Sequence, residues 1–378
     1  MHIEYHIRER PITTPHTPAI MLIGSRINPL LRGLPILPLS DTFRSQNFTE
    51  PEVSEEEELI WETRGIAYGI IAPILITVGI IGNLLTILLL SQKRFKGMTY
   101  TFFRVLAFSD LISLFFCISF IIHILKPTTP VYSTAFWYAH FEVFFTNVPM
   151  SVSVLTVVYI TIDRYFSVCR STQFKIIHTK KYARIGIGIA ILISIVVWLP
   201  ASFVKVVRLS TDCESFNFDK VPTDNRTYYV ACMEKDTMKS PAYMVYSWTR
   251  QTVVSFVPIL VLLTLNALII KGYIEVIKRR EEMRSYPQTS DGTRKSLGPQ
   301  ELTQIKNDQN LIRMLYAIMI SFFITMLPPG IANAIYTEFL STELQYEIFR
   351  AVANDLEMLN HAMNFYIYVI LCKPLRAA

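Results

Sequence analysis

Long apolar segments alternate with short polar ones along the chain, and this alternation predicts a helical membrane protein. A bilayer core of about 30 Å needs roughly 20 apolar residues of helix, because only a helix or a closed barrel satisfies every backbone group there. Segments of this length cover residues 66–90, 102–125, 138–168, 184–204, 243–271, 311–336 and 348–371. The third is the least regular, because Glu142, Asn147 and Pro149 interrupt it. We therefore predict seven membrane-spanning helices.

The composition fits lipid surroundings better than water. Of the 378 residues, 51% are hydrophobic and 17% are charged, and the mean hydropathy is +0.35. An ordinary soluble domain carries more charge and fewer apolar residues. The net charge of +6 raises nucleic acid as a partner, but no basic and aromatic binding motif interrupts the apolar segments. We expect a lipid bilayer as a partner and no nucleic acid.

Charged residues between the segments predict the orientation of the chain. Lys and Arg concentrate in short cytosolic loops of membrane proteins. Here the basic loops and end carry Lys93, Arg94, Lys96, Arg170, Lys175, Lys180, Lys181, Arg184, Lys373 and Arg376. The opposite side is acidic, with Glu55 to Glu58, Glu62, Glu338, Glu343 and Glu347. We expect a multi-pass protein of the plasma membrane whose N-terminus is extracellular and whose C-terminus is cytosolic.

The chain divides into three predicted regions. We expect residues 1–64 to form a largely disordered extracellular tail, residues 65–372 the seven-helix membrane domain, and residues 373–378 a short cytosolic stub. Residues 278–306 mix charges of both signs with Ser, Pro and Gly, which predicts a flexible cytosolic loop within the domain. Asn47 and Asn225 begin Asn-X-Thr sequons on the predicted outer face and are candidate glycosylation sites.

Polar residues inside the apolar segments carry the chemistry, because each needs an internal partner or a function in a bilayer. Four short motifs hold many of them, one each in the first, second, third and seventh segments. They are Gly82-Asn83, Leu106 to Leu111 with Asp110, Asp163-Arg164-Tyr165, and Asn364 to Tyr368. In these segments and this order, the motifs resemble those of rhodopsin-like G-protein-coupled receptors over roughly residues 65–376. The resemblance implies an all-α bundle of seven helices that binds an extracellular ligand and activates a heterotrimeric G protein.

The resemblance implies an activation switch at Asp163, Arg164 and Tyr165. An arginine at the inner membrane edge can pair with a carboxylate at rest and release it on activation. In the family, the acidic partner on helix six maps to Asp308, although Asp308 is equally well read as a solvated charge at the start of a helix. Tyr368 is expected to swing inward during activation.

The resemblance also implies a polar core that holds a sodium ion. In this family the Asp of the second helix joins polar groups of helices three and seven around the ion, and here these residues are Asp110, Ser153, Asn360 and Asn364. The alternative is a buried Asp110 that is hydrogen-bonded to Asn83 and water, with no ion. No other cofactor or metal is expected.

Two departures from the family pattern narrow the expected subfamily. Phe322 lies six residues before the kink proline Pro328, as in other members, but Met326 occupies the place of the usual Trp. Met326 must then do the packing of this helix-six relay. Phe365 likewise replaces the usual Pro of the seventh-helix motif. With these changes the chain is similar to invertebrate FMRFamide-receptor-like neuropeptide receptors.

The same comparison with family members restricts the ligand. The helix-three position of the amine-binding Asp is Thr146, and the retinal-binding Lys is replaced by Met358, so neither an amine nor retinal is expected. The acidic outer rim would steer a cationic, possibly amidated peptide. Candidate ligand contacts are Glu142, Thr146, Asp355 and Glu357.

Other function classes remain as alternatives. An orphan chemosensory receptor for a small molecule is the main competitor. A transporter would require repeats with interrupted helices in two halves, and we find no internal repeat. An enzyme is not expected, because the chain has no nucleotide loop, zinc spacing or nucleophile–base pair.

The cysteines predict one disulfide outside the membrane. Of the five, Cys213 and Cys232 fall in the oxidising compartment. The bridge usual in the family cannot form, because its helix-three position is Ala139. Cys213 and Cys232 are therefore the disulfide candidate. Cys372 lies at the inner interface and is a candidate for palmitoylation, with an inert thiol as the alternative.

Overall fold

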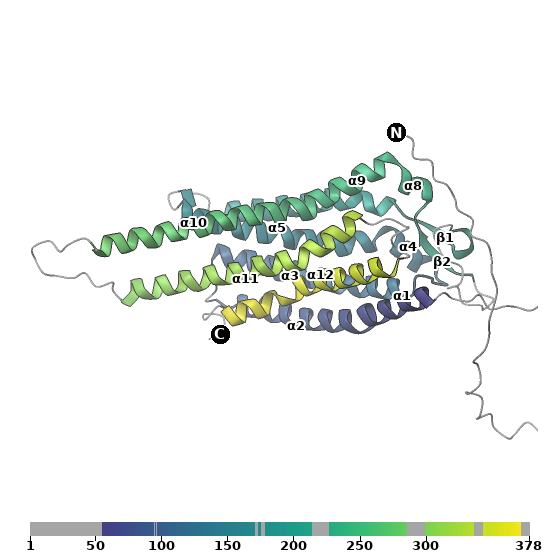
Figure 1. Ribbon diagram of the computed structural model, residues 1–378, viewed down its shortest axis with the longest axis horizontal. Helices are drawn as coiled ribbons and strands as arrows, with labels where there is room; N and C mark the ends of the chain where they lie inside the picture. Colours follow the sequence, from purple (N-terminus) through teal and green to yellow (C-terminus); the bar gives the residue numbers. More distant parts are fainter. Residues whose placement is uncertain are drawn as a thin grey trace, which may run out of the picture. The chain divides into compact units, whose positions relative to one another are not determined.

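The computed structural model describes residues 55–93, 95, 97–170, 173–174, 178–213, 227–285, 299–335 and 343–371. Most of these residues are helical, and the long helices run side by side along one axis (Figure 1). Asn47, Asn225 and Cys372 lie outside the described residues, so their predicted modifications stay predictions.

All seven predicted spans are helical where the structure describes them. The long helices, with the short turns that continue them, are α1 (Glu55–Ile66), a π-helical turn (Ala67–Ile71), α2 (Ala72–Leu90), α3 (Met98–Leu125), α5 (Glu142–Cys169), α7 (Lys180–Trp198), a 3₁₀ turn (Leu199–Phe203), α9 (Pro241–Gln251), a π-helical turn (Thr252–Phe256), α10 (Val257–Ser285), α11 (Pro299–Ile335) and α12 (Leu344–Leu371).

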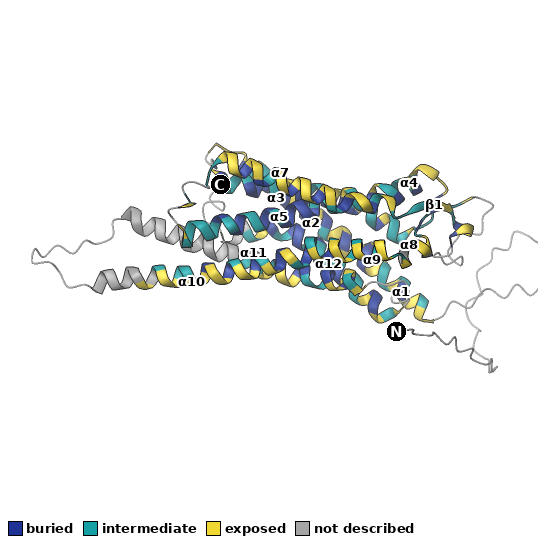
Figure 2. Ribbon diagram, turned by 90° about the horizontal axis from the view of Figure 1, so that it is seen from above, coloured by how far each residue is buried: buried dark blue, intermediate teal, exposed yellow. Residues whose placement is uncertain are grey.

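The outer sides of these helices are apolar and exposed. Five described helices are long and apolar enough to cross a membrane, and Met319–Ile335 of α11 adds a shorter apolar one. Figure 2 shows exposed positions along the outer sides of α7 and α10. Leu88, Leu192 and Leu260 are each more than half exposed. Such side chains are unfavourable in water and well solvated by lipid, which fits a multi-pass membrane protein.

A continuous apolar core fills the middle of the bundle. Leu106 of α3, Val154 of α5 and Ile259 of α10 pack in one cluster with Phe322 and Met326 of α11. Phe322 and Met326, the predicted relay residues, are both buried. Pro328 lies inside α11, two residues after Met326, as the sequence places it. Met326 therefore contributes to the packing between α11 and its neighbours.

A small sheet lies at one end of the bundle, which we call the hairpin end. Strands β1 (Val206–Leu209) and β2 (Tyr229–Cys232) pair antiparallel, with Val206 opposite Cys232. Cys213 and Cys232 form a disulfide with a Cα–Cα distance of 5.8 Å, which confirms the predicted pairing. Short helices α4 (Tyr132–His140) and α8 (Lys235–Lys239) lie at the same end (Figure 1).

The structure corrects three predicted boundaries. Helix α1 begins at Glu55, inside the predicted tail of residues 1–64, with four glutamates in its first turn. Helices α10 and α11 extend into the predicted loop of residues 278–306, up to Ser285 and from Pro299. The third span, predicted from residue 138, divides at Phe141 into α4 and α5. Apolar periodicity misses helix ends that leave the membrane, because charged helix-forming residues continue them there.

Gly79 sets the closest approach between α2 and its neighbours. A Cβ atom at this position would lie 2.6 Å from Leu114 Cδ1 and 2.9 Å from Ala362 Cβ. Only glycine therefore allows α2, α3 and α12 to pack this closely.

We predict that Gly79→Ala lowers the stability of the purified protein by about 1–3 kcal/mol, the usual cost of overpacking a core. The measurement is the thermal unfolding midpoint in detergent. Gly188→Ala is the matched control, because no atom lies within 4 Å of the added Cβ there. Equal midpoints for the two variants would contradict the packing argument.

Candidate functional site

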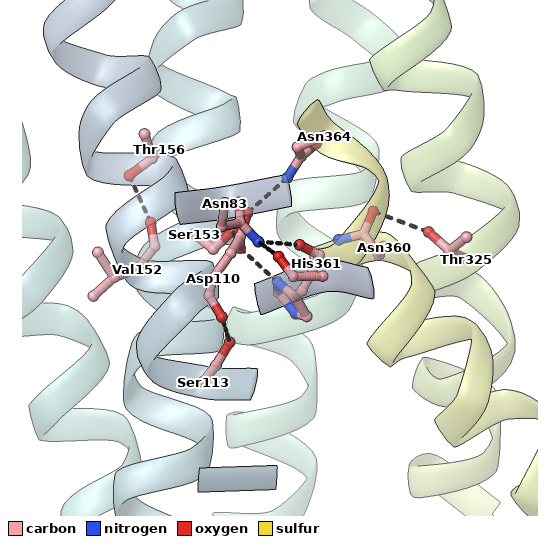
Figure 3. Close-up of polar contacts among 11 residues, drawn as sticks. Asn83, Asp110, Ser113, Val152, Ser153, Thr156, Thr325, Asn360, His361 and Asn364 are labelled. Atoms are coloured by element: carbon pink, nitrogen blue, oxygen red, sulfur yellow. Dashed lines mark hydrogen bonds and ion pairs between the residues drawn. The ribbon is translucent and has the colours of Figure 1, made fainter. Parts of the chain in front are cut away.

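Asp110 is the centre of a buried polar cluster between α3, α5 and α12 (Figure 3). Its Oδ1 accepts a hydrogen bond from Ser153 Oγ at 2.5 Å and lies 2.7 Å from His361 Nδ1. Its Oδ2 accepts from Asn364 Nδ2 at 2.7 Å. The structure thus brings Asp110, Ser153 and Asn364 together.

Two other predicted members of the polar core bond to partners other than Asp110. Asn360 accepts a hydrogen bond from Thr325 Oγ1 at 3.0 Å and so connects α12 to α11 instead of reaching Asp110. Asn83 donates to the backbone oxygens of Gly79 at 3.0 Å and His361 at 2.9 Å. His361 was not among the predicted residues, although a histidine inside an apolar span is a signal of function.

The predicted switch lies at the opposite end of the bundle from the hairpin. Arg164 Nη2 donates to Asp163 Oδ2 at 2.8 Å and also to Thr99 Oγ1 of α3. The second carboxylate oxygen of Asp163 lies 2.8 Å from His178 Nδ1. Tyr165, next in the chain, packs edge-to-face on Phe166. Arg164 is therefore held by its own helix and by α3.

The remaining predicted switch residues are only partly described. Asp308 lies within α11 and Tyr368 within α12, but their side chains are outside the described part of the structure. The proposed resting contact between Arg164 and Asp308 therefore stays a prediction.

A cavity of about 190 Å³ lies in the half of the bundle nearer the hairpin end. Side chains of α3, α5, α9, α11 and α12, with Trp198 at the end of α7, line it. Two predicted ligand contacts are among them, Thr146 and Glu357. Arg250 of α9 also lines the cavity and stacks over Trp198 at 4.9 Å. The cavity therefore presents one carboxylate and one guanidinium.

These two charges are not paired with each other in the described part of the structure. Neither an ion pair nor a hydrogen bond joins Glu357 to another described residue, and Arg250 Nε has no hydrogen-bond partner there. A ligand that brings both a cation and an acceptor would satisfy both groups.

The family model for the seven-transmembrane receptors of the rhodopsin family matches residues 82–368, which include the polar core and Arg164. The chain belongs to the rhodopsin family of seven-transmembrane receptors. Membership confirms the predicted seven-helix bundle and places the receptor in a non-enzymatic family. Helix α12 is one of the seven membrane spans. It is long enough to cross a bilayer, and it also carries polar residues, such as Asn360 and Asn364, that bond to other helices inside the bundle.

Receptors of nematodes and mammals are similar to this chain. The "Probable G-protein coupled receptor B0563.6" of Caenorhabditis elegans is 27% identical over 80% of this chain and 66% of that receptor. "Probable G-protein coupled receptor AH9.1" of the same organism is 26% identical over 83% of this chain and 74% of that receptor. The pyroglutamylated RF-amide peptide receptor of Rattus norvegicus is 22% identical over 81% of this chain and 67% of that receptor. The chain thus spans about two thirds to three quarters of these relatives.

The residues around Asp110 do not fit the sodium ion that the family implies. A hard cation is bound by oxygen ligands. Here the imidazole Nδ1 of His361 and the amide nitrogen of Asn364 each lie 2.7 Å from one carboxylate oxygen of Asp110. Both nitrogens act as donors toward a carboxylate and direct positive charge at the place of the ion. Asn360, a predicted ligand, bonds to Thr325 instead.

Glu142, a predicted ligand contact, lies in a polar cluster of its own. It is 1% exposed, accepts from Ser119 Oγ at 3.0 Å, and lies 2.5 Å from His123 Nδ1. Trp137 donates to Ser119 Oγ at 2.8 Å, so the cluster joins α3, α4 and α5. Glu142 does not line the cavity, and neither does Asp355, whose Oδ1 is buried without a partner among the described residues. The contacts of Glu142 favour a structural role at the hairpin end.

We predict that Glu142→Ala destabilises the receptor by about 3–5 kcal/mol, the typical cost of removing one partner of a buried pair. Thermal unfolding of the purified receptor measures this. In the matched control, Glu234→Ala, the expected loss is about 0–1 kcal/mol, because Glu234 and its partner Arg208 are both exposed. A Glu142→Ala variant as stable as this control would favour a role for Glu142 in ligand binding instead.

Proposed function

We propose that the receptor binds a cationic, amidated peptide at the extracellular face of the plasma membrane and activates a heterotrimeric G protein in the cytosol. The observation that carries the proposal is the cavity that a carboxylate, Glu357, and a guanidinium, Arg250, both line.

Two features support the orientation that the proposal needs. The hairpin end carries the Cys213–Cys232 disulfide, and disulfides persist on the oxidising side of a membrane. The loops near Arg164 are rich in Lys and Arg, as cytosolic loops are. In this orientation the cavity lies toward the extracellular side, where the ligand arrives, and Arg164 lies toward the cytosol, where the G protein binds.

The two charges of the cavity match the two ends of a short amidated motif. An arginine of the peptide would form a charge-assisted hydrogen bond with Glu357, and the C-terminal amide oxygen would accept from the guanidinium of Arg250, which also lines the cavity. The volume of about 190 Å³ is below the roughly 300–1,000 Å³ of sites for drug-sized ligands, so it fits the last residues of a peptide. The relative named as an RF-amide peptide receptor is consistent with this ligand class.

The same small volume also fits a small dipolar molecule, which makes a chemosensory receptor the second candidate. A screen against a library of amidated peptides, each with one arginine near its C-terminus, separates the two. Activation of cells by such a peptide supports the peptide receptor. A screen without any active peptide, but with an active small molecule, supports the alternative.

We predict that Glu357→Gln lowers the potency of an active peptide about 10- to 100-fold, because a hydrogen bond to a charged group contributes about 1.5–3 kcal/mol. Replacing the peptide arginine by the uncharged citrulline should cause the same loss, and no further loss in Glu357→Gln. Dose–response curves measure these effects. Glu234→Gln, at an exposed site of the hairpin end, is the matched control with unchanged potency. Additive losses for the two changes would show that Glu357 and the arginine do not meet.

We predict that Arg164→Ala abolishes agonist-stimulated nucleotide exchange on the G protein and leaves peptide binding within a few-fold of the wild type. Exchange and binding are measured on the same membranes. Arg184→Ala is the control, because Arg184 is exposed and, among the residues that the structure describes, its side chain bonds to Lys180 O of its own helix at 3.4 Å. Normal exchange in Arg164→Ala would remove Arg164 from the coupling machinery.

A further inference from the structure

We propose that His361 is a built-in hydrogen-bond donor to Asp110 and occupies the place of a sodium ion in this receptor. The proposal concerns the polar core alone and does not depend on the identity of the ligand.

Asp110 needs donors to compensate its buried carboxylate. Asp110 and His361 are both 0% exposed, and their Oδ1 and Nδ1 atoms lie 2.7 Å apart. A carboxylate in a low-dielectric interior is costly unless a cation or several donors compensate it. Ser153 and Asn364 supply two donors. Because an ionised carboxylate oxygen can only accept, His361 Nδ1 is the third donor.

These donors already occupy both carboxylate oxygens of Asp110. Oδ1 faces Ser153 Oγ and His361 Nδ1, and Oδ2 faces Asn364 Nδ2. An ion at either oxygen would therefore have to displace a buried donor.

The part of α12 that carries the His361 ring is held in place. Asn83 of α2 donates to the backbone oxygen of His361 at 2.9 Å. Ala362, the next residue, packs closely on Gly79 of α2. A Cβ atom added at Gly79 would lie 2.9 Å from the Cβ of Ala362. Figure 3 shows His361 directed at Asp110 from α12. The helix that carries the ring is therefore held against α2, and the ring cannot leave without loss of this contact.

A sodium ion at Asp110 would need the oxygen that faces His361 Nδ1, and this donor nitrogen already occupies that place. A small hydroxyl side chain at position 361 would remove the donor nitrogen, leave room beside Oδ1 and add an oxygen ligand. The exchange should convert the receptor into one that binds sodium.

The test is thermal unfolding of the purified full-length receptor in NaCl and in choline chloride at equal ionic strength, without any ligand. The wild type should unfold at the same temperature in both salts. His361→Ser should show a sodium-specific rise of about 2 °C or more, because an ion that binds only the folded state stabilises it. Adding Asp110→Asn to His361→Ser should remove the rise.

Two results would overturn the proposal. One is a sodium-specific rise in the wild type that Asp110→Asn abolishes. The other is a folded His361→Ser variant without a sodium effect. If His361→Ser does not fold, His361→Asn takes its place, since its neutral amide also offers an oxygen ligand. Should neither variant fold, the wild type decides: equal unfolding in both salts supports the proposal, and a sodium-specific rise overturns it.

Discussion

The carboxylate of Asp110 joins three helices at one buried point, and the geometry of the bundle interior depends on it. Ser153 of α5 and His361 and Asn364 of α12 all direct hydrogen-bonding groups at its two oxygens. In a bilayer no water replaces a hydrogen-bond donor that moves away from Asp110. Moving one of these helices alone would therefore leave a buried carboxylate without a partner, which is costly. Changes in helix arrangement must therefore exchange these bonds rather than break them.

A second constraint follows from the polar face of α12. This helix pairs Asn360 with Thr325 of α11, and its His361 backbone accepts from Asn83 of α2. Each bond satisfies a group that lipid would leave unsatisfied. The helix is therefore a poor match to a simple apolar span and a good match to the interior of a bundle. Its place is fixed by its polar contacts as much as by its length.

The sequence predicted the bundle and most of the polar core, because apolar length and four motifs in order determine both. Asp110, Ser153 and Asn364 come together as the motifs imply. Asn360 bonds to Thr325 and not to Asp110, and the contact of His361 with Asp110 was not predicted. Neighbouring positions on a helix point about 100° apart, so two side chains that are adjacent in the sequence can meet different helices. Only packing against α2 and α11 fixes that rotation.

The ends of the helices were harder to predict for a different reason. Outside the membrane a helix no longer needs an apolar side, so the apolar pattern ends at residue 271 and resumes at residue 311, although α10 continues to Ser285 and α11 begins at Pro299. Strand β1 is four residues long, too short for alternation to stand out, and it forms through pairing with β2. The disulfide was predictable from compartment alone, because only two cysteines lie on the outer side in the predicted topology.

Glu357, His361 and Asn364 follow one another on α12 at intervals of four and three residues, so they lie along one face of the helix. The first lines the cavity, and the other two contact Asp110. Asp110 is where α3, α5 and α12 meet. In the proposed binding mode, the ligand contact at Glu357 lies one helical turn from His361 on the same helix, so a shift of α12 at the cavity would strain the bonds to Asp110.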